Sequence, residues 1–199
     1  MILIIDTSSS GIGLVLGSGA EHAEGGLVKH IATEKQTLDL PHAVEKFLHE
    51  NGADWRDLTA IGVVVGPGSF TGIRLGIAYA KGIAMGLNPS PRGGAEAGIP
   101  VISINAFEIY LQKTPDAFVA IDSNKGDFFC ASKNHAPCVM TIDEVESEQM
   151  KCPQTVGHEP FDLTGALPIV QRKLSANSNE PVIPMYLKPS YAERNCQSS

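Results

Sequence analysis

A glycine-punctuated segment in the middle of the chain constrains its fold more than any other feature. Residues 66–72 read Gly-Pro-Gly-Ser-Phe-Thr-Gly, between an apolar β-branched run at 61–65 and a helix-like run at 73–85. We predict a strand–loop–helix junction here, because a β-branched run is followed by an unobstructed turn and by a Ser or Thr that can cap the next helix. Junctions of this kind often present backbone amides to an anion or to another chain. A tight turn that needs unusual backbone angles is the alternative interpretation.

The spacing within this segment does not fit two familiar phosphate-binding loops. A P-loop needs four residues between its glycines and then Gly-Lys-Ser/Thr, whereas no Lys follows Gly72. Gly66, Gly68 and Gly72 do not have the spacing of the Gly-x-Gly-x-x-Gly sequence of a dinucleotide fold.

Composition narrows the class of protein. A chain of 199 residues with 43% hydrophobic content can bury a core as one domain or as two small ones. The formal net charge of -7 argues against a protein that grips nucleic acid alone, because phosphate neutralisation needs clustered Lys and Arg. The first residues lack a basic leader and their apolar run is too short for a membrane span, so we expect a cytoplasmic protein with no membrane partner. The cysteines form no Cys-x-x-Cys pair, so we expect reduced thiols.

Two helices are predicted beside the central junction. Residues 41–50 have apolar side chains at helical spacing, begin with a proline suited to a first turn, and stop at Asn51-Gly52, a favoured carboxy-terminal cap. Glycine inside a helix costs roughly 1 kcal/mol relative to alanine. We therefore expect the small residues of the second helix to let another backbone approach closely, within the chain or across a subunit interface. These residues recur every fourth position, with two further glycines beside that stripe: Gly72, Gly76, Ala80, Ala84, Gly82 and Gly86.

The chain contains an internal echo. Residues 120–126 repeat the pattern of residues 4–11: a strand ending in Ile-Asp, a polar turn, a glycine, and then apolar residues. This repetition predicts two similar half-domains. We place the boundary near Asn105, which gives an N-terminal domain at residues 1–105, with the glycine loop and the two helices, and a smaller C-terminal domain at residues 106–199.

Three motifs stand out: Ile-Asp-Thr-Ser at residues 5–8, Gly-Pro-Gly-Ser-Phe-Thr-Gly-Ile-Arg-Leu-Gly at residues 66–76, and the repeated Ala-Ile-Asp-x-x-x-Gly at residues 120–126. Together they resemble the TsaB family, whose members are subunits of the bacterial tRNA threonylcarbamoyladenosine synthase. Residues 184–188 are similar to the family's terminal Pro-x-Tyr-Leu-Arg. The resemblance implies an α/β, actin-like and sugar-kinase-like (ribonuclease H-like) duplicated fold, with mixed sheets flanked by helices and a shortened second domain.

The resemblance also implies a role without catalysis. TsaB-like proteins pair with a metal-bearing, TsaD-like paralogue that, with a small TsaE-like ATPase, modifies the adenosine beside the anticodon of tRNA. That paralogue carries Asn-His-x-Glu-Gly-His, and its two histidines correspond to Ala106 and Tyr110 here. We therefore expect no catalytic residue and no bound metal, contact with tRNA only through partners, and a homodimer when the partner is absent. Lys35 stands where relatives often have His.

Two sets of site residues follow from the resemblance. Asp6, Thr7 and Ser8 correspond to the turn that approaches the phosphates and magnesium in actin-like ATPases, so they are candidates for binding nucleotide. We expect no tightly bound cofactor, and ATP or ADP with magnesium only in the assembled complex. The alternative function is a minimal actin-like ATPase or phosphotransferase that uses Asp6 and Asp122. The expected partner interface lies on the two helices, at Pro41, Val44, Leu48, Phe70, Gly72, Gly76, Ala80, Ile83 and Ala84.

Overall fold

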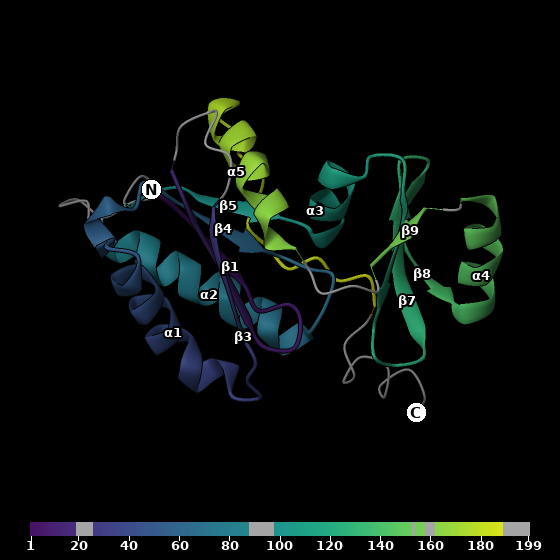
Figure 1. Cartoon of the computed structure of the whole chain (residues 1–199), viewed down its shortest axis with the longest axis horizontal. Helices are drawn as coiled ribbons and strands as arrows, with labels where there is room; N and C mark the ends of the chain where they lie inside the picture. The colour runs from purple at the N-terminus through teal and green to yellow at the C-terminus, as the bar shows by residue number, and fades with distance from the viewer. Residues whose placement is uncertain (19–25, 88–97, 153, 158–161, 189–199) are drawn as a thin grey trace.

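Two β-sheets flanked by helices make up the protein (Figure 1). The computed structural model describes residues 1–18, 26–87, 98–152, 154–157 and 162–188. Within these ranges, no helix combines the length and the apolar character that crossing a membrane requires.

The first sheet has an antiparallel and a parallel half. Strand order is β3-β2-β1-β4-β5, with β1, β2 and β3 antiparallel and β1, β4 and β5 parallel. Its central strands are apolar at nearly every position because they are covered on both faces. The strands are β1 (Ile2–Asp6), β2 (Ile12–Gly17), β3 (Leu27–Ile31), β4 (Ala60–Val64) and β5 (Val101–Ile104).

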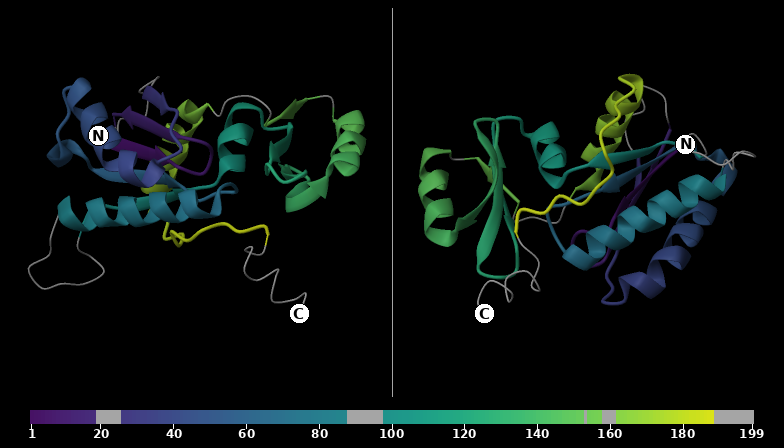
Figure 2. Two further views of the ribbon diagram at one scale, coloured as in Figure 1. Left: turned by 90° about the horizontal axis from the view of Figure 1, so that it is seen from below. Right: turned by 180° about the vertical axis from the view of Figure 1, so that it is seen from behind.

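Helices cover the two faces of this sheet unequally. Alternate side chains of a strand point to opposite faces, and accordingly Leu3 and Ile5 of β1 pack in the core with α1 and α2. Ile2 and Ile4 pack instead in the core with α5 and α3. Figure 2 shows α1 and α2 side by side on one face, with α5 on the other. The four helices are α1 (Gln36–Glu50), α2 (Phe70–Leu87), α3 (Ala106–Lys113) and α5 (Ala166–Ser175).

The second sheet repeats the first in shortened form. Its order is β8-β7-β6-β9, in which β6 pairs antiparallel with β7 and parallel with β9, as β1 pairs with β2 and β4. Asp6 and Asp122 end the two corresponding strands. The predicted duplication, the mixed α/β class and the smaller second sheet are therefore confirmed. The elements are β6 (Phe118–Asp122), β7 (Asp127–Ser132), β8 (His135–Thr141), α4 (Ile142–Lys151) and β9 (Thr155–Val156).

The path of the chain between the two sheets differs from the boundary drawn from the sequence. Residues 106–199 are not confined to the second sheet, because α3 and α5 pack against the core of the first. Ala166, Ile169 and Val170 of α5 are fully buried there. The second sheet is covered by α4 on one face, and its other face packs against Phe107 of α3.

The helix boundaries also correct one prediction. α1 begins at Gln36 rather than at residue 41, so Pro41 lies inside the helix and not in its first turn. The predicted carboxy-terminal cap is confirmed: Asn51 is the C-cap, and Gly52 follows with φ +66°. α3 begins with a capping box in which Asn105 and Glu108 bind each other's backbone amides.

Candidate functional site at the glycine loop

The glycine loop, residues 66–72, packs directly onto the turn that follows β1. The Ser69 amide donates to the Ser8 carbonyl oxygen at 2.6 Å. A methyl group on Gly72 would stand 1.9 Å from the carbonyl oxygen of Thr7, and one on Gly68 would stand 2.2 Å from that of Ser8. Glycine is required at these positions because two backbones meet without room for a side chain. The Ser69 hydroxyl accepts from the Gly72 amide at 3.2 Å, which confirms the predicted helix cap.

The nucleotide candidates Asp6, Thr7 and Ser8 are all buried in this turn. The amide and the hydroxyl of Ser8 both donate to Asp6 Oδ1, at 2.8 and 2.6 Å. The Thr7 hydroxyl donates to the Gly72 carbonyl oxygen at 2.7 Å. Burial raises the pKa of Asp6, and the bonds from Ser8 oppose that shift. The three side chains thus use their polar groups within the chain, whereas Asp122 is exposed in the corresponding turn and accepts from the Asn124 amide at 2.7 Å.

Gln36 is a residue of this site that the sequence did not reveal. It is the first residue of α1, and its Nε2 donates to the carbonyl oxygens of Thr7 at 3.3 Å, Ser9 at 3.0 Å and Gly11. One side chain therefore holds the start of α1 against the turn after β1. A lone glutamine carries no motif, so no sequence signal could have identified it.

The start of α3 brings Ala106 and Tyr110 close to the same turn. Burial raises the pKa of Tyr110 to about 12, and the negative charge of Asp6 adds to the shift. Ala106 has no ligating atom, and a protonated phenol is a poor metal ligand. Within the described ranges, no three His, Cys, Asp or Glu side chains are grouped so as to hold a metal ion. Ala106 and Tyr110 therefore do not fit a bound metal ion.

A segment from the end of the described chain packs against the glycine loop and the start of α2. We call residues 184–188 the terminal strap; its docking place could not be predicted because its contacts are distant in sequence. The Met185 amide donates to the Val65 carbonyl oxygen at 2.8 Å. The ring of Tyr186 stacks on Phe70 at 4.3 Å between centroids, and Arg74 Nε donates to its hydroxyl at 2.6 Å.

The terminal strap also reaches the second sheet. Lys188 Nζ contacts Asp127, donates to the Ser123 hydroxyl at 3.0 Å, and lies 5.2 Å from the centre of the Phe129 ring. Met185 packs against apolar residues of both cores. The strap therefore connects the glycine loop of the first sheet with the strands of the second.

The predicted interface residues divide into an exposed and a buried group. Pro41 is exposed, and Phe70 and Ile83 are half-buried. The remaining six lie inside the fold of this chain: Val44, Leu48, Gly72, Gly76, Ala80 and Ala84. Their small or apolar side chains face the first sheet and the turn after β1. They therefore do not offer a surface to a partner, and of the two alternatives for the small-residue stripe, close packing within the chain is the one observed.

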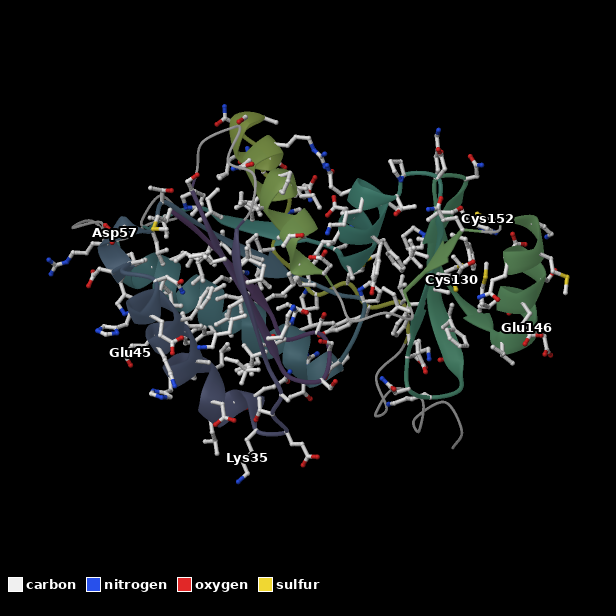
Figure 3. The ribbon with its side chains drawn as sticks, viewed as in Figure 1. Lys35, Glu45, Asp57, Cys130, Glu146 and Cys152 are labelled. Atoms are coloured by element: carbon white, nitrogen blue, oxygen red, sulfur yellow. The ribbon has the colours of Figure 1, made fainter. Side chains whose placement is uncertain are left out.

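A second row of small residues on α2 does face outward. Among the residues that the structure describes, methyl groups on Gly82 and Gly86 would meet no neighbouring element within 4 Å, and Ala78, on the same side of the helix, is exposed. Two large apolar side chains are exposed on the same pair of helices, Leu38 of α1 at 73% and Met85 of α2 at 66%. We call these residues, with Pro41, the outer α1–α2 surface; Leu38 lies in the first turn of α1 and Met85 in the last turn of α2. Lys35 lies exposed at the N-terminal end of α1 (Figure 3).

The fold and site define a class of protein: a two-lobed α/β chain of the actin-like, ribonuclease H-like type. Solved structures agree with this class. YeaZ from Pseudomonas aeruginosa superposes with a TM-score of 0.71 at 17% identity and covers 94% of this chain and 99% of that chain. A second structure, described as an uncharacterized protein with similarity to peptidase YeaZ from Pseudomonas aeruginosa, gives the same TM-score at 18% identity and the same coverage.

The family follows from the sequence comparisons. The model described as "TsaD: tRNA N6-adenosine threonylcarbamoyltransferase" matches residues 16–158, which is more than half of the chain, and the chain therefore belongs to this family. A tRNA N6-adenosine threonylcarbamoyltransferase from Erythrobacter litoralis is 37% identical over 84 residues, 42% of this chain. One from Cereibacter sphaeroides is 37% identical over 93 residues, 46% of this chain. The matched segments span 22% and 23% of these relatives' lengths.

Proposed function

We propose that this chain is a non-catalytic, TsaB-type subunit of a system that attaches threonylcarbamoyl to the adenosine beside the anticodon of tRNA. The proposal rests mainly on two residues of α3. Ala106 and Tyr110 occupy the positions at which the TsaD-like paralogue has two metal-binding histidines. Membership of the TsaD family supports the reaction system, and the replaced ligands support a role other than catalysis.

The turn after β1 supports the same division of roles. The Ser8 hydroxyl donates to Asp6 and the Thr7 hydroxyl donates to the glycine loop, so both hydroxyl groups are engaged within the chain. We expect ATP or ADP with magnesium to be held by the assembled complex rather than by this chain alone. The TsaE-like ATPase and tRNA would then meet this chain only through its catalytic partner.

The outer α1–α2 surface is our choice for contact with the TsaD-like paralogue. Its exposed apolar side chains, Leu38 and Met85, gain from burial in a complex. The open space beside Gly82 and Gly86 lets another helix approach α2 closely. The same surface would support a homodimer when the paralogue is absent.

A substitution at Gly82 tests this surface without disturbing the core. Leucine is a better helix former than glycine, and its Cβ at this position would meet no other element of the described residues within 4 Å. We expect Gly82→Leu to fold and to lose co-purification with the TsaD-like paralogue. Ser147→Leu, on the exposed side of α4, is the matched control and should still co-purify. Full retention of the partner by Gly82→Leu would place the interface elsewhere.

An activity assay tests the role itself. Purified paralogue, ATPase and tRNA are supplied with threonylcarbamoyl-adenylate, and modified adenosine is measured with and without this chain. We expect product only when this chain is present together with the paralogue. Product formed by this chain and tRNA alone would establish catalysis and overturn the proposal.

A further inference from the structure

A cavity lies away from the glycine loop, between the two lobes. It measures about 610 Å³ and is lined by α3 and Arg172 of α5 on one side and by residues 131–137, around the β7–β8 turn, on the other. We call it the α3 cleft. It shares no lining residue with the turn after β1, the glycine loop or the terminal strap. Small-molecule sites typically measure about 300–1,000 Å³, so its size suits a ligand of nucleotide dimensions.

Two cations line the α3 cleft from its opposite sides. Arg172 Nη1 donates to a neutral partner, Gln112 Oε1, at 3.1 Å. Lys133 Nζ is 3.5 Å from Asp116, and both side chains of that pair are more than 70% exposed, so solvent screens it strongly. Neither cation is paired with a buried carboxylate, and both line the cleft, Arg172 from α5 and Lys133 from the β7–β8 turn. Guanidinium and ammonium groups bind phosphate oxygens by charge-assisted hydrogen bonds.

The acidic residue of the cleft does not cancel these charges. Glu108 Oε1 lies 2.9 Å from Lys173 Nζ, and Glu108 Oε2 accepts from the Asn105 amide at 2.9 Å. Lys173 lies between two carboxylates, because its Nζ is also 2.8 Å from Glu180 Oε2. Among the lining residues themselves, two cations, Arg172 and Lys133, stand against the one carboxylate of Glu108.

The remaining lining has two chemical characters. Phe107, Leu111 and Pro137 contribute apolar surface. Gln112 and Asn134 contribute amides that can pair with the polar edge of a heterocycle. This lining matches a planar base that carries one phosphate. The base would lie on the apolar surface beside the amides, and the phosphate would meet the cations. We propose that the α3 cleft binds a nucleoside monophosphate, with its phosphate between Arg172 and Lys133. This assignment is independent of the partner surface proposed above.

Titration with AMP, followed by calorimetry on the full chain, tests the proposal. We expect binding that weakens at least about tenfold in Arg172→Gln, because a charge-assisted hydrogen bond is lost. Lys133→Gln provides a second exposed variant and should weaken binding similarly. Circular dichroism confirms that each variant is folded. Unchanged AMP affinity in both variants would overturn the assignment.

A neighbouring cavity supplies the matched control. A smaller cleft of about 290 Å³ on the other side of the β7–β8 turn includes Lys133 and Lys151 but not Arg172. AMP affinity should survive Lys151→Gln; its loss there, with retention in Arg172→Gln, would move the ligand to the smaller cleft. Adenosine should bind at least about tenfold more weakly than AMP, since it lacks the phosphate. Inorganic phosphate that binds as tightly as AMP would refute a role for the apolar floor.

Discussion

Gly72 and Gly82 lie on the same helix but have opposite surroundings, so the same substitution should change stability in opposite directions. In Gly72→Ala, the new methyl would stand 1.9 Å from the Thr7 carbonyl oxygen, whereas ordinary contact begins near 3.4 Å. The backbone would therefore have to move by about 1.5 Å, the difference between these two distances. In Gly82→Ala, the methyl meets no other element of the described part of the chain within 4 Å.

The cost at Gly72 can be worked out from its contacts. Overpacking a buried site costs about 1–3 kcal/mol. Moving Thr7 also disturbs two hydrogen bonds, from its hydroxyl to Gly72 and from Gln36 to its carbonyl oxygen, each worth about 1 kcal/mol. We expect Gly72→Ala to lower the free energy of unfolding by about 2–5 kcal/mol. Gly82→Ala should raise it by about 0.5–1 kcal/mol, the difference in helix propensity.

Urea unfolding followed by circular dichroism measures both values. Each variant is examined at two protein concentrations, so that self-association through the outer α1–α2 surface can be separated from folding. The midpoint should fall for Gly72→Ala and rise for Gly82→Ala, with similar denaturant dependence. A Gly72→Ala protein within about 0.5 kcal/mol of the parent would refute the close contact between the glycine loop and the turn after β1.

Three further predictions concern single side chains. Lys188→Met keeps apolar surface over Phe129 but removes the ammonium that contacts Asp127, so we expect the free energy of unfolding to fall by about 1–3 kcal/mol in urea titrations; no change would mean that the terminal strap adds no stability. Burial raises the pKa of Cys130 to about 12, so iodoacetamide at about pH 8 should label it only after unfolding, and rapid labelling of the native protein would contradict this. Burial also raises the pKa of Asp6, so the protonated carboxyl stabilises the folded protein and this contribution is lost as pH rises through the folded-state pKa. Between about pH 4 and about pH 7, Asp6→Asn should therefore lose less stability than the parent. Equal losses in the two proteins would count against this.

The position of Cys130 explains its expected protection. It is fully buried on the side of the second sheet that faces α4 (Figure 3). It pairs in register with Cys138 of β8, and both residues are free thiols. The negative charge of Glu144 on α4 adds to the effect of burial on both thiol pKa values.

Local patterns predicted the repeated hairpins and the central strand–loop–helix junction. The repeated Ile-Asp followed by a polar turn predicted two related sheets, and β1–β2 and β6–β7 are the corresponding hairpins. The junction at residues 66–72 predicted a strand, a loop and a capped helix, which are β4, the glycine loop and α2. These features depend on neighbours within a few residues, where backbone preference and apolar periodicity act directly.

The exposed face of α2 could not be predicted in the same way. Two rows of small residues run along α2 with the same four-residue spacing, and only the packing of the helix against Thr7 decides that Gly72 and Gly76 are buried while Gly82 is exposed. The sequence alone did not show which of the two rows lies inside the fold.

The amino-acid sequence by itself was enough to indicate the family and the duplicated fold. Both are encoded in short motifs whose conformations are set by local sterics and hydrogen bonding. Tertiary structure alone decided which side chains meet at long range. Arg74 and Tyr186 are 112 residues apart in sequence, and Lys188 binds Ser123 across 65 residues. α5 follows the strands of the second sheet in sequence but packs on the first. Contacts of this kind depend on how whole elements pack together, and no local propensity encodes them.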